Sequence, residues 1–203
     1  MSESIFLLTI ISAYLVGSIP FAILVSRVSN LPDPRSFGSG NPGATNVLRT
    51  GNKFAAAITL VADAFKGYIA VVACTWLVTL FDATVWITTA VALAAFLGHL
   101  FPIYLKFRGG KGVATGLGVL IALNWHIGVM AMFFWLLVAY ITRYSSLAAI
   151  VSLICTLVFT FFLDAIHNFV AVFFILIFVI LKHKQNIQNL VSGNESKISF
   201  NSK

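Results

Sequence analysis

The feature that most constrains the fold is a series of apolar segments separated by short polar loops. Seven such segments occupy residues 5–28, 54–81, 83–105, 113–123, 127–141, 147–163 and 169–181. About 20 apolar residues in a helix are enough to cross a bilayer core about 30 Å thick. Only 9% of the residues are charged and 60% are hydrophobic, which excludes a water-soluble globule. We therefore expect a single all-α domain over residues 1–203, a polytopic membrane bundle of about seven transmembrane helices.

The basic residues predict the orientation of this bundle. All 13 lysines and arginines except Lys66, which lies within a segment, fall on one side of the map, whereas Glu3, Asp82 and Asp164 fall on the other. Because basic loops stay in the cytoplasm, we expect the N-terminus outside and the C-terminus inside. The net charge of +7 then indicates anionic lipid or substrate, and no nucleic acid.

The segments 113–123 and 127–141 are short for full crossings. They form either two short spans in a thinned or tilted arrangement, or a re-entrant hairpin shielded by protein.

Two glycine-rich loops lie on the predicted cytoplasmic side. The first runs from Gly38 to Asn46 and ends on Arg49, and its backbone amides and polar side chains suit an anion such as phosphate. The second, residues 106–112, contains Gly109, Gly110 and Lys111 before a segment that looks helical from Val113, which also favours a phosphate. The alternatives are a tight connector for the first loop and a basic cytoplasmic turn for the second.

Charged residues also occur inside the second apolar segment. Asp63 and Lys66 are three residues apart and share a helical face. They form either a structural ion pair or a support for the polar loops, because a charge inside a membrane requires a partner. His99 and His126 are more simply explained as packing residues.

Polar loops on one face, with apolar helices behind them, suit a phosphate-bearing substrate that carries a hydrocarbon tail. The natural reaction is lipid synthesis at the cytoplasmic leaflet. The chain has no G-x-S-x-G motif, no His-x4-Asp pair and no His/Cys/carboxylate cluster for a metal, and we expect neither metal nor cofactor. The competing class is a transporter or flippase for an anionic lipid or metabolite, which usually contains related repeats; the sequence has none.

Several motifs occur in an order that resembles a known family. They are Gly17-Ser18-Ile19-Pro20, the Gly38–Asn46 loop with Arg49, Asp63-x-x-Lys66-Gly67, Gly98-His99-x-x-Pro102, the Phe107–Thr115 run, Arg143-Tyr144-x-Ser146-Leu147 and His183-x-x-Asn186-Ile187. Together they span nearly the whole chain and resemble the bacterial acyl-phosphate-dependent glycerol-3-phosphate acyltransferases of the PlsY family. Asn189 and Lys184 stand where the family commonly has arginine.

The resemblance implies transfer of a fatty acyl group from acyl phosphate to the 1-hydroxyl of sn-glycerol 3-phosphate, which gives 1-acylglycerol 3-phosphate and phosphate. It implies a multi-pass protein of the bacterial cytoplasmic (inner) membrane with its active site facing the cytoplasm. Its partners would be acyl phosphate, glycerol 3-phosphate and membrane lipids, with the soluble enzyme that makes acyl phosphate as a further candidate.

An acyl phosphate carries a good leaving group, so the site needs positioning and charge stabilisation rather than a covalent nucleophile. We expect Ser39, Ser146 and His183 to be catalytic, with either His183 or the substrate's own phosphate as the base. The expected substrate-binding residues are Gly38, Gly40, Asn41, Gly43, Thr45, Asn46, Arg49, Lys66, Gly110, Lys111 and Asn186.

Overall fold

The structure is a computed structural model that describes residues 3–81, 84–162 and 166–198, so Asp82, Asp164 and Lys203 lie outside it. The described residues form helices and no strands, which confirms the all-α prediction. The helices are α1 (Glu3–Gly17), α2 (Phe21–Val28), α3 (Ala44–Leu48), α4 (Lys53–Leu80), α5 (Val85–Leu100), the 3-10 helix η1 (Ile103–Leu105), α6 (Val113–Leu123), α7 (Trp125–Thr142), α8 (Ser145–Phe162), α9 (Ile166–Lys182) and α10 (Lys184–Val191).

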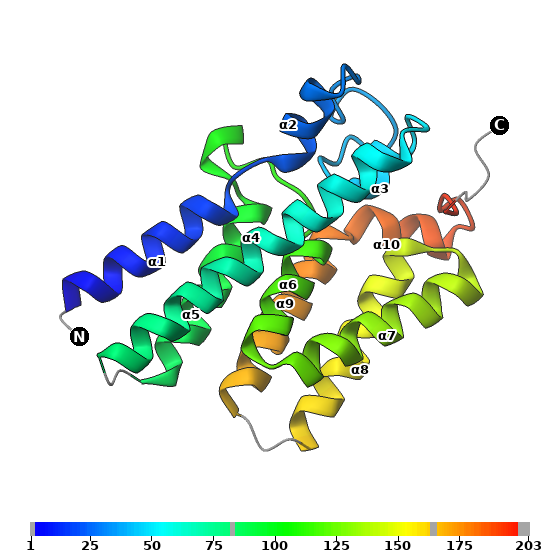
Figure 1. Cartoon of the computed structure of the whole chain (residues 1–203). Helices are drawn as coiled ribbons and strands as arrows, with labels where there is room; N and C mark the ends of the chain where they lie inside the picture. The colour runs from blue at the N-terminus through cyan, green and yellow to red at the C-terminus, as the bar shows by residue number, and fades with distance from the viewer. Residues whose placement is uncertain (1–2, 82–83, 163–165, 199–203) are drawn as a thin grey trace.

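The long helices form one bundle with α6 and α9 near its centre (Figure 1). Helices α1, α4 and α5 pack together on one side, whereas α7 and α8 form a hairpin on the other. The larger core is formed by residues of α4 to α9 and is built around fully buried side chains such as Phe96, Leu120 and Ile175. A second core joins α1, α4 and α5 around Cys74 and Val91.

Small residues allow the helices to approach closely at two crossings. Gly17 of α1 lies against the backbone of Ala95 in α5, and Gly118 of α6 lies against the backbone of Ala64 in α4. Close backbone approach is a usual source of helix association in lipid, where burial of apolar surface gives little driving force. These crossings fix α5 and α6, whose ends lead into and out of the second glycine loop.

Four described helical segments are long and apolar enough to cross a membrane, or up to six if the bent pairs α1–α2 and α9–α10 each form one span. Helix α6 has 11 residues, about 16 Å of helix, so it is shorter than a bilayer core. Helix α7, with 18 residues, is long enough to cross. The total of about seven spans and the orientation of the termini stay predictions.

The first apolar segment is broken, although the sequence predicts one continuous span over residues 5–28. Helix α1 ends at Gly17 and α2 begins at Phe21 after a bend of 40°. Pro20 explains the break, because proline has no N–H and disfavours helical geometry at the residue before it. The carbonyl oxygen of Ile19 accepts a hydrogen bond from Lys66 Nζ at 2.7 Å instead.

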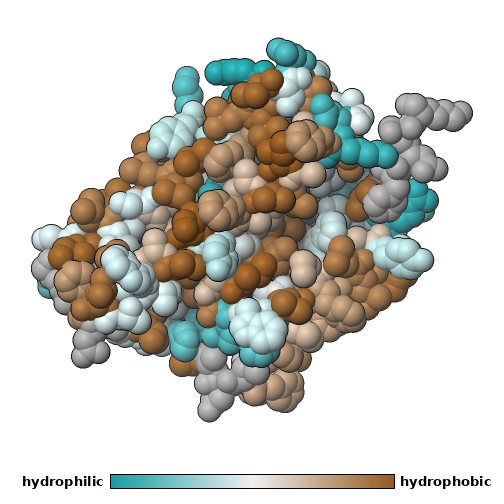
Figure 2. Space-filling model, viewed as in Figure 1, coloured by the Kyte–Doolittle hydropathy of each residue, from teal (hydrophilic) through white to brown (hydrophobic). Residues whose placement is uncertain are grey.

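The polar chain that follows the last predicted apolar segment, residues 169–181, is also helical in part. It forms α10 after a bend of 64° from α9. Figure 2 shows hydrophilic residues gathered at the end of the molecule that carries α2, α3 and α10, above a mostly hydrophobic flank. This polar end contains the two glycine loops and is where the candidate site lies.

Candidate active site

Four segments meet at one polar cluster. Lys111 Nζ, from the second glycine loop, donates to Asn186 Oδ1 of α10 at 2.5 Å. Asn186 Nδ2 in turn donates to Glu195 Oε1 at 2.7 Å, and Ser146 Oγ of α8 donates to the same oxygen at 2.5 Å. The structure therefore brings together three predicted site residues, Ser146, Lys111 and Asn186, which are far apart in the sequence.

Glu195 is the member of this cluster that is not among the residues predicted from the sequence. It lies after α10, in the polar chain that follows the last predicted apolar segment. Its one sequence signal is that it is the only acidic residue after position 164. By accepting hydrogen bonds from Ser146 and Asn186, its carboxylate fixes the orientation of both side chains.

Arg49 connects the first glycine loop to this cluster. Its guanidinium donates to Ser196 Oγ at 2.6 Å, next to Glu195, and to Asn46 Oδ1 at 3.4 Å. Partial burial lowers the pKa of Lys111, while Glu195 raises it and Arg49 lowers it again. Two cations, Arg49 and Lys111, thus lie close enough to act on each other, which is the arrangement that an anionic ligand requires.

Asn46 organises the first glycine loop. Its side chain is buried, donates to the carbonyl oxygens of Pro34 and Phe37, and accepts from the backbone N–H of Ser39. Gly38 has φ +57° and lies directly against Asn46 and Arg49, a position with no room for a side chain. The loop is thereby folded back on α3, whose first residue follows Gly43.

The other residues predicted from this loop lie at its surface. Ser39, Gly40 and Thr45 are exposed, and Asn41 and Gly43 are half-buried. Gly43 has an extended backbone, with φ −151°, and immediately precedes the first residue of α3. Direct substrate contacts by these five residues, and by the buried Asn46, stay predictions.

His183 lies between α9 and α10 and is 3% exposed. Its Nδ1 lies 2.8 Å from the carbonyl oxygen of Val179, so Nδ1 carries the proton and Nε2 is left with a free lone pair. Burial lowers the pKa of His183 to about 4; the Val179 hydrogen bond and Glu195 oppose this, and Lys111 adds to it. The imidazole is therefore neutral at physiological pH and lies within electrostatic reach of Lys111 and Glu195.

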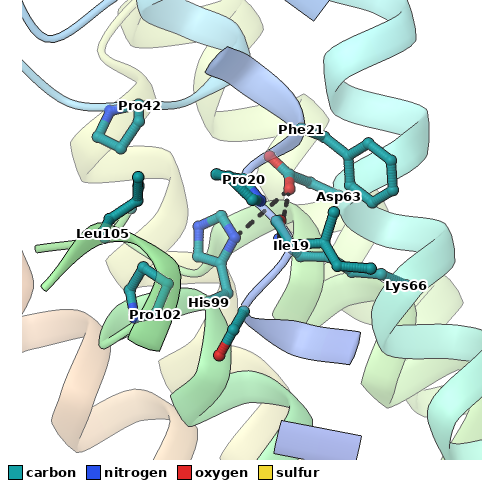
Figure 3. Close-up of a pocket in the computed structure, with 12 residues that line it drawn as sticks. Ile19, Pro20, Phe21, Pro42, Asp63, Lys66, His99, Pro102 and Leu105 are labelled. Carbon is teal, nitrogen blue, oxygen red and sulfur yellow. Dashed lines mark hydrogen bonds and ion pairs between the residues drawn. The ribbon is translucent and has the colours of Figure 1, made fainter. Parts of the chain in front are cut away.

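A second, buried cluster lies beside the second glycine loop and is formed by Asp63, Lys66 and His99 (Figure 3). Lys66 Nζ lies 2.7 Å from Asp63 Oδ1, and His99 Nδ1 lies 3.5 Å from the same oxygen. These residues, with Pro42 and Gly110, line a small pocket. Gly110 packs directly on the His99 ring, so a Cβ there would collide with it.

The ion pair predicted for Asp63 and Lys66 is confirmed, and the pair adjoins the second glycine loop through His99, while its role as a support for that loop stays a prediction. Lys66 is 3% exposed and its ammonium is already engaged by Asp63 and by the Ile19 carbonyl. This leaves one of its three N–H donors for another partner. Binding of substrate by Lys66 stays a prediction.

The geometry can be compared with known proteins. Residues 7–193 match the protein family described as glycerol-3-phosphate acyltransferase. The glycerol-3-phosphate acyltransferase of Nitrosomonas eutropha is 50% identical over 95% of this chain and 97% of its own length. That of Laribacter hongkongensis is 52% identical over 94% of each chain.

Solved structures agree with the sequence comparison. The crystal structure of PlsY (YgiH), an integral membrane glycerol 3-phosphate acyltransferase, in its glycerol 3-phosphate form is 34% identical, covers 96% of each chain and has a TM-score of 0.88. The lysophosphatidic acid form of that protein gives a TM-score of 0.86 over 95% of this chain. The resemblance inferred from the motifs is confirmed, and the chain belongs to the glycerol-3-phosphate acyltransferase family.

Proposed function

We propose that the chain transfers a fatty acyl group from acyl phosphate to the 1-hydroxyl of sn-glycerol 3-phosphate and releases inorganic phosphate. The observation that carries this proposal is the meeting of Arg49, Lys111, Ser146 and Asn186 at the polar end of an apolar bundle. The cluster offers charge and hydrogen-bond donors to phosphate groups, while the adjoining helices face the lipid from which an acyl chain can enter. Family membership favours this reaction over transport.

The two substrates bring two phosphate groups to the site. Lys111 and Arg49 supply the positive charge, and Asn186 Nδ2 keeps one N–H for a phosphate oxygen beside the one that it donates to Glu195. The single O–H of Ser146 is donated to Glu195, so Ser146 must release that carboxylate before it can donate to a substrate. Ser39 and the amides of the first glycine loop are proposed to hold the acyl phosphate and its developing oxyanion, the charge that preorganised donors stabilise most.

In the chemical step the glycerol hydroxyl oxygen bonds to the acyl carbonyl carbon, and the bond from that carbon to the phosphate oxygen breaks. Phosphate leaves with the bonding electrons, and the hydroxyl proton must pass to a base. With a pKa of about 4, His183 is a weaker base than a substrate phosphate, whose second pKa is about 6. We therefore assign the proton to the phosphate and assign His183 Nε2 a hydrogen bond to substrate.

The protein is an integral membrane protein, as its family and apolar helices show. We propose that the bundle lies in the bacterial inner membrane with the site on the cytoplasmic face, since its basic loops are there by the positive-inside rule. A water-soluble enzyme that produces acyl phosphate would then deliver this donor from the cytoplasm.

The donor can be tested with purified protein in detergent. Palmitoyl phosphate and palmitoyl-coenzyme A are supplied at equal concentration with glycerol 3-phosphate, and the acylated product is quantified by mass spectrometry. The proposal predicts 1-palmitoylglycerol 3-phosphate from the phosphate donor only. Equal or faster formation from the thioester would overturn the donor assignment while leaving the acyltransferase family intact.

A further inference from the structure

The C-terminal end of α5 is a junction between the two halves of the candidate site. A helix end leaves carbonyl oxygens without intrahelical partners, and they must be paired elsewhere. Here the His99 carbonyl accepts from Gly110 N at 3.1 Å, and the Leu100 carbonyl accepts from Gly109 N at 3.3 Å. Tyr14 Oη of α1 donates to the Phe101 carbonyl at 2.6 Å. The second glycine loop is thus attached to the last turn of α5 directly before Lys111.

Lys182 attaches the other half of the site to the same place. It is the last residue of α9, and its Nζ donates to the Leu100 carbonyl at 2.7 Å. The same ammonium lies 4.1 Å from the centroid of the Phe101 ring, within cation–π distance. The Leu100 carbonyl oxygen is therefore shared by Gly109 and Lys182.

These contacts form a closed path through the site. From Leu100 one branch leads through Gly109 to Lys111, and the other leads through Lys182 to His183 and Asn186. The branches meet again where Lys111 Nζ donates to Asn186 Oδ1. The Leu100–Lys182 contact therefore links the position of α10 to that of the second glycine loop.

We propose that Lys182 is a positioning residue for the acyl transfer, which holds Asn186 and His183 in register with Lys111 by binding the end of α5. The proposal rests on the proposed function of this site. The simpler explanation for a lysine at this position is that it only adds to the positive charge of the cytoplasmic side and extends toward lipid headgroups. Its half-buried side chain turns inward instead, onto a helix C-terminus where a cation is favoured by the helix dipole.

The test uses Lys182→Met, which keeps the aliphatic stem and removes the ammonium. Its matched control is Lys184→Met, which removes an exposed charge two residues further on. We expect Lys182→Met to lower kcat/KM for glycerol 3-phosphate at least ten-fold and to weaken the stabilisation that glycerol 3-phosphate gives in a melting assay. Lys184→Met should change kcat/KM by less than three-fold and leave the stabilisation by glycerol 3-phosphate as in the wild type. Lys182→Arg should recover most of the kcat/KM that Lys182→Met loses.

A double-mutant cycle separates positioning from general stability, because residues that act through one network are not additive. In a Lys111→Ala background, Lys182→Met should lower kcat/KM for glycerol 3-phosphate by less than a further three-fold. A full ten-fold further loss, or equal losses from Lys182→Met and Lys184→Met, would overturn the proposal. If Lys182→Met does not fold, Phe101→Leu replaces it, because this variant removes the ring that the Lys182 ammonium contacts. A three-fold or greater loss of kcat/KM that disappears in the Lys111→Ala background supports positioning. A loss that adds to that of Lys111→Ala, or no loss, refutes it. Wild-type protein with no acyl transfer would instead refute the proposed function.

Discussion

Lys111→Met is the substitution whose effect can be worked out most directly from the site. Methionine keeps the unbranched apolar stem of the side chain and removes the ammonium that donates to Asn186 beside Arg49 and Glu195. In the proposed complex this ammonium contacts a substrate phosphate, and a charge-assisted hydrogen bond contributes about 1.5 to 3 kcal/mol. Since about 1.4 kcal/mol corresponds to a factor of ten, kcat/KM should fall by about ten- to hundred-fold.

The assay is the initial rate of phosphate release from palmitoyl phosphate in detergent, with glycerol 3-phosphate varied. Lys106→Met is the matched control, because Lys106 belongs to the same loop and is exposed. We expect the control to keep wild-type efficiency and Lys111→Met to lose it without a large fall in melting temperature. Equal efficiencies for the two variants would refute the assignment of the second glycine loop as a phosphate site and leave it a connector.

Four further predictions follow from the same geometry. Ser39→Ala should lower kcat about a hundred-fold at unchanged melting temperature, because Ser39 is exposed and a donor to the oxyanion contributes about 2.7 to 4 kcal/mol; near-normal turnover would remove it from the site. Gly110→Ala should lower both activity and melting temperature, since its methyl group collides with the His99 ring; a variant as stable and active as wild type would contradict this packing. Because the pKa of His183 falls from 6.5 to about 4 on folding, its contribution to stability is present above pH 6.5 and is lost as the pH falls toward 4; His183→Gln should flatten the melting temperature over that range, and an unchanged slope would contradict the shift. In a cysteine-free background in intact cells, an impermeant thiol reagent should label Ile166→Cys and not Ser192→Cys, and the reverse pattern would invert the predicted orientation.

Much of the fold follows from the sequence because hydropathy and basic loops act locally. The predicted apolar segments correspond to the long helices, and the Asp63–Lys66 spacing correctly indicates an ion pair. The break at Pro20 was not predicted, since the apolar run continues on both sides and hides it. Helix α10 was missed because its residues are mostly polar and its formation depends on how α9 ends.

The site was predicted less completely, because its geometry depends on contacts between distant segments. Lys111, Ser146 and Asn186 could be chosen from loop composition and family resemblance. Glu195 could not, since its role appears only when the tail folds back to Ser146 and Asn186. In the sequence, Lys182 counts only among the basic residues that predict the orientation of the bundle. Its contact with the Leu100 carbonyl arises from the packing of α9 against α5.

Direct transfer of the acyl group between two substrates held at one site fixes the stoichiometry of the reaction, and measuring that stoichiometry tests it. Purified protein is incubated with palmitoyl phosphate, with or without glycerol 3-phosphate, and phosphate, acylated product and intact protein mass are measured in the same samples. Direct transfer predicts one phosphate per 1-palmitoylglycerol 3-phosphate, no phosphate and no acylated product without glycerol 3-phosphate, and an unmodified protein throughout. Phosphate released without acceptor, together with a palmitoyl group on the protein, would contradict it.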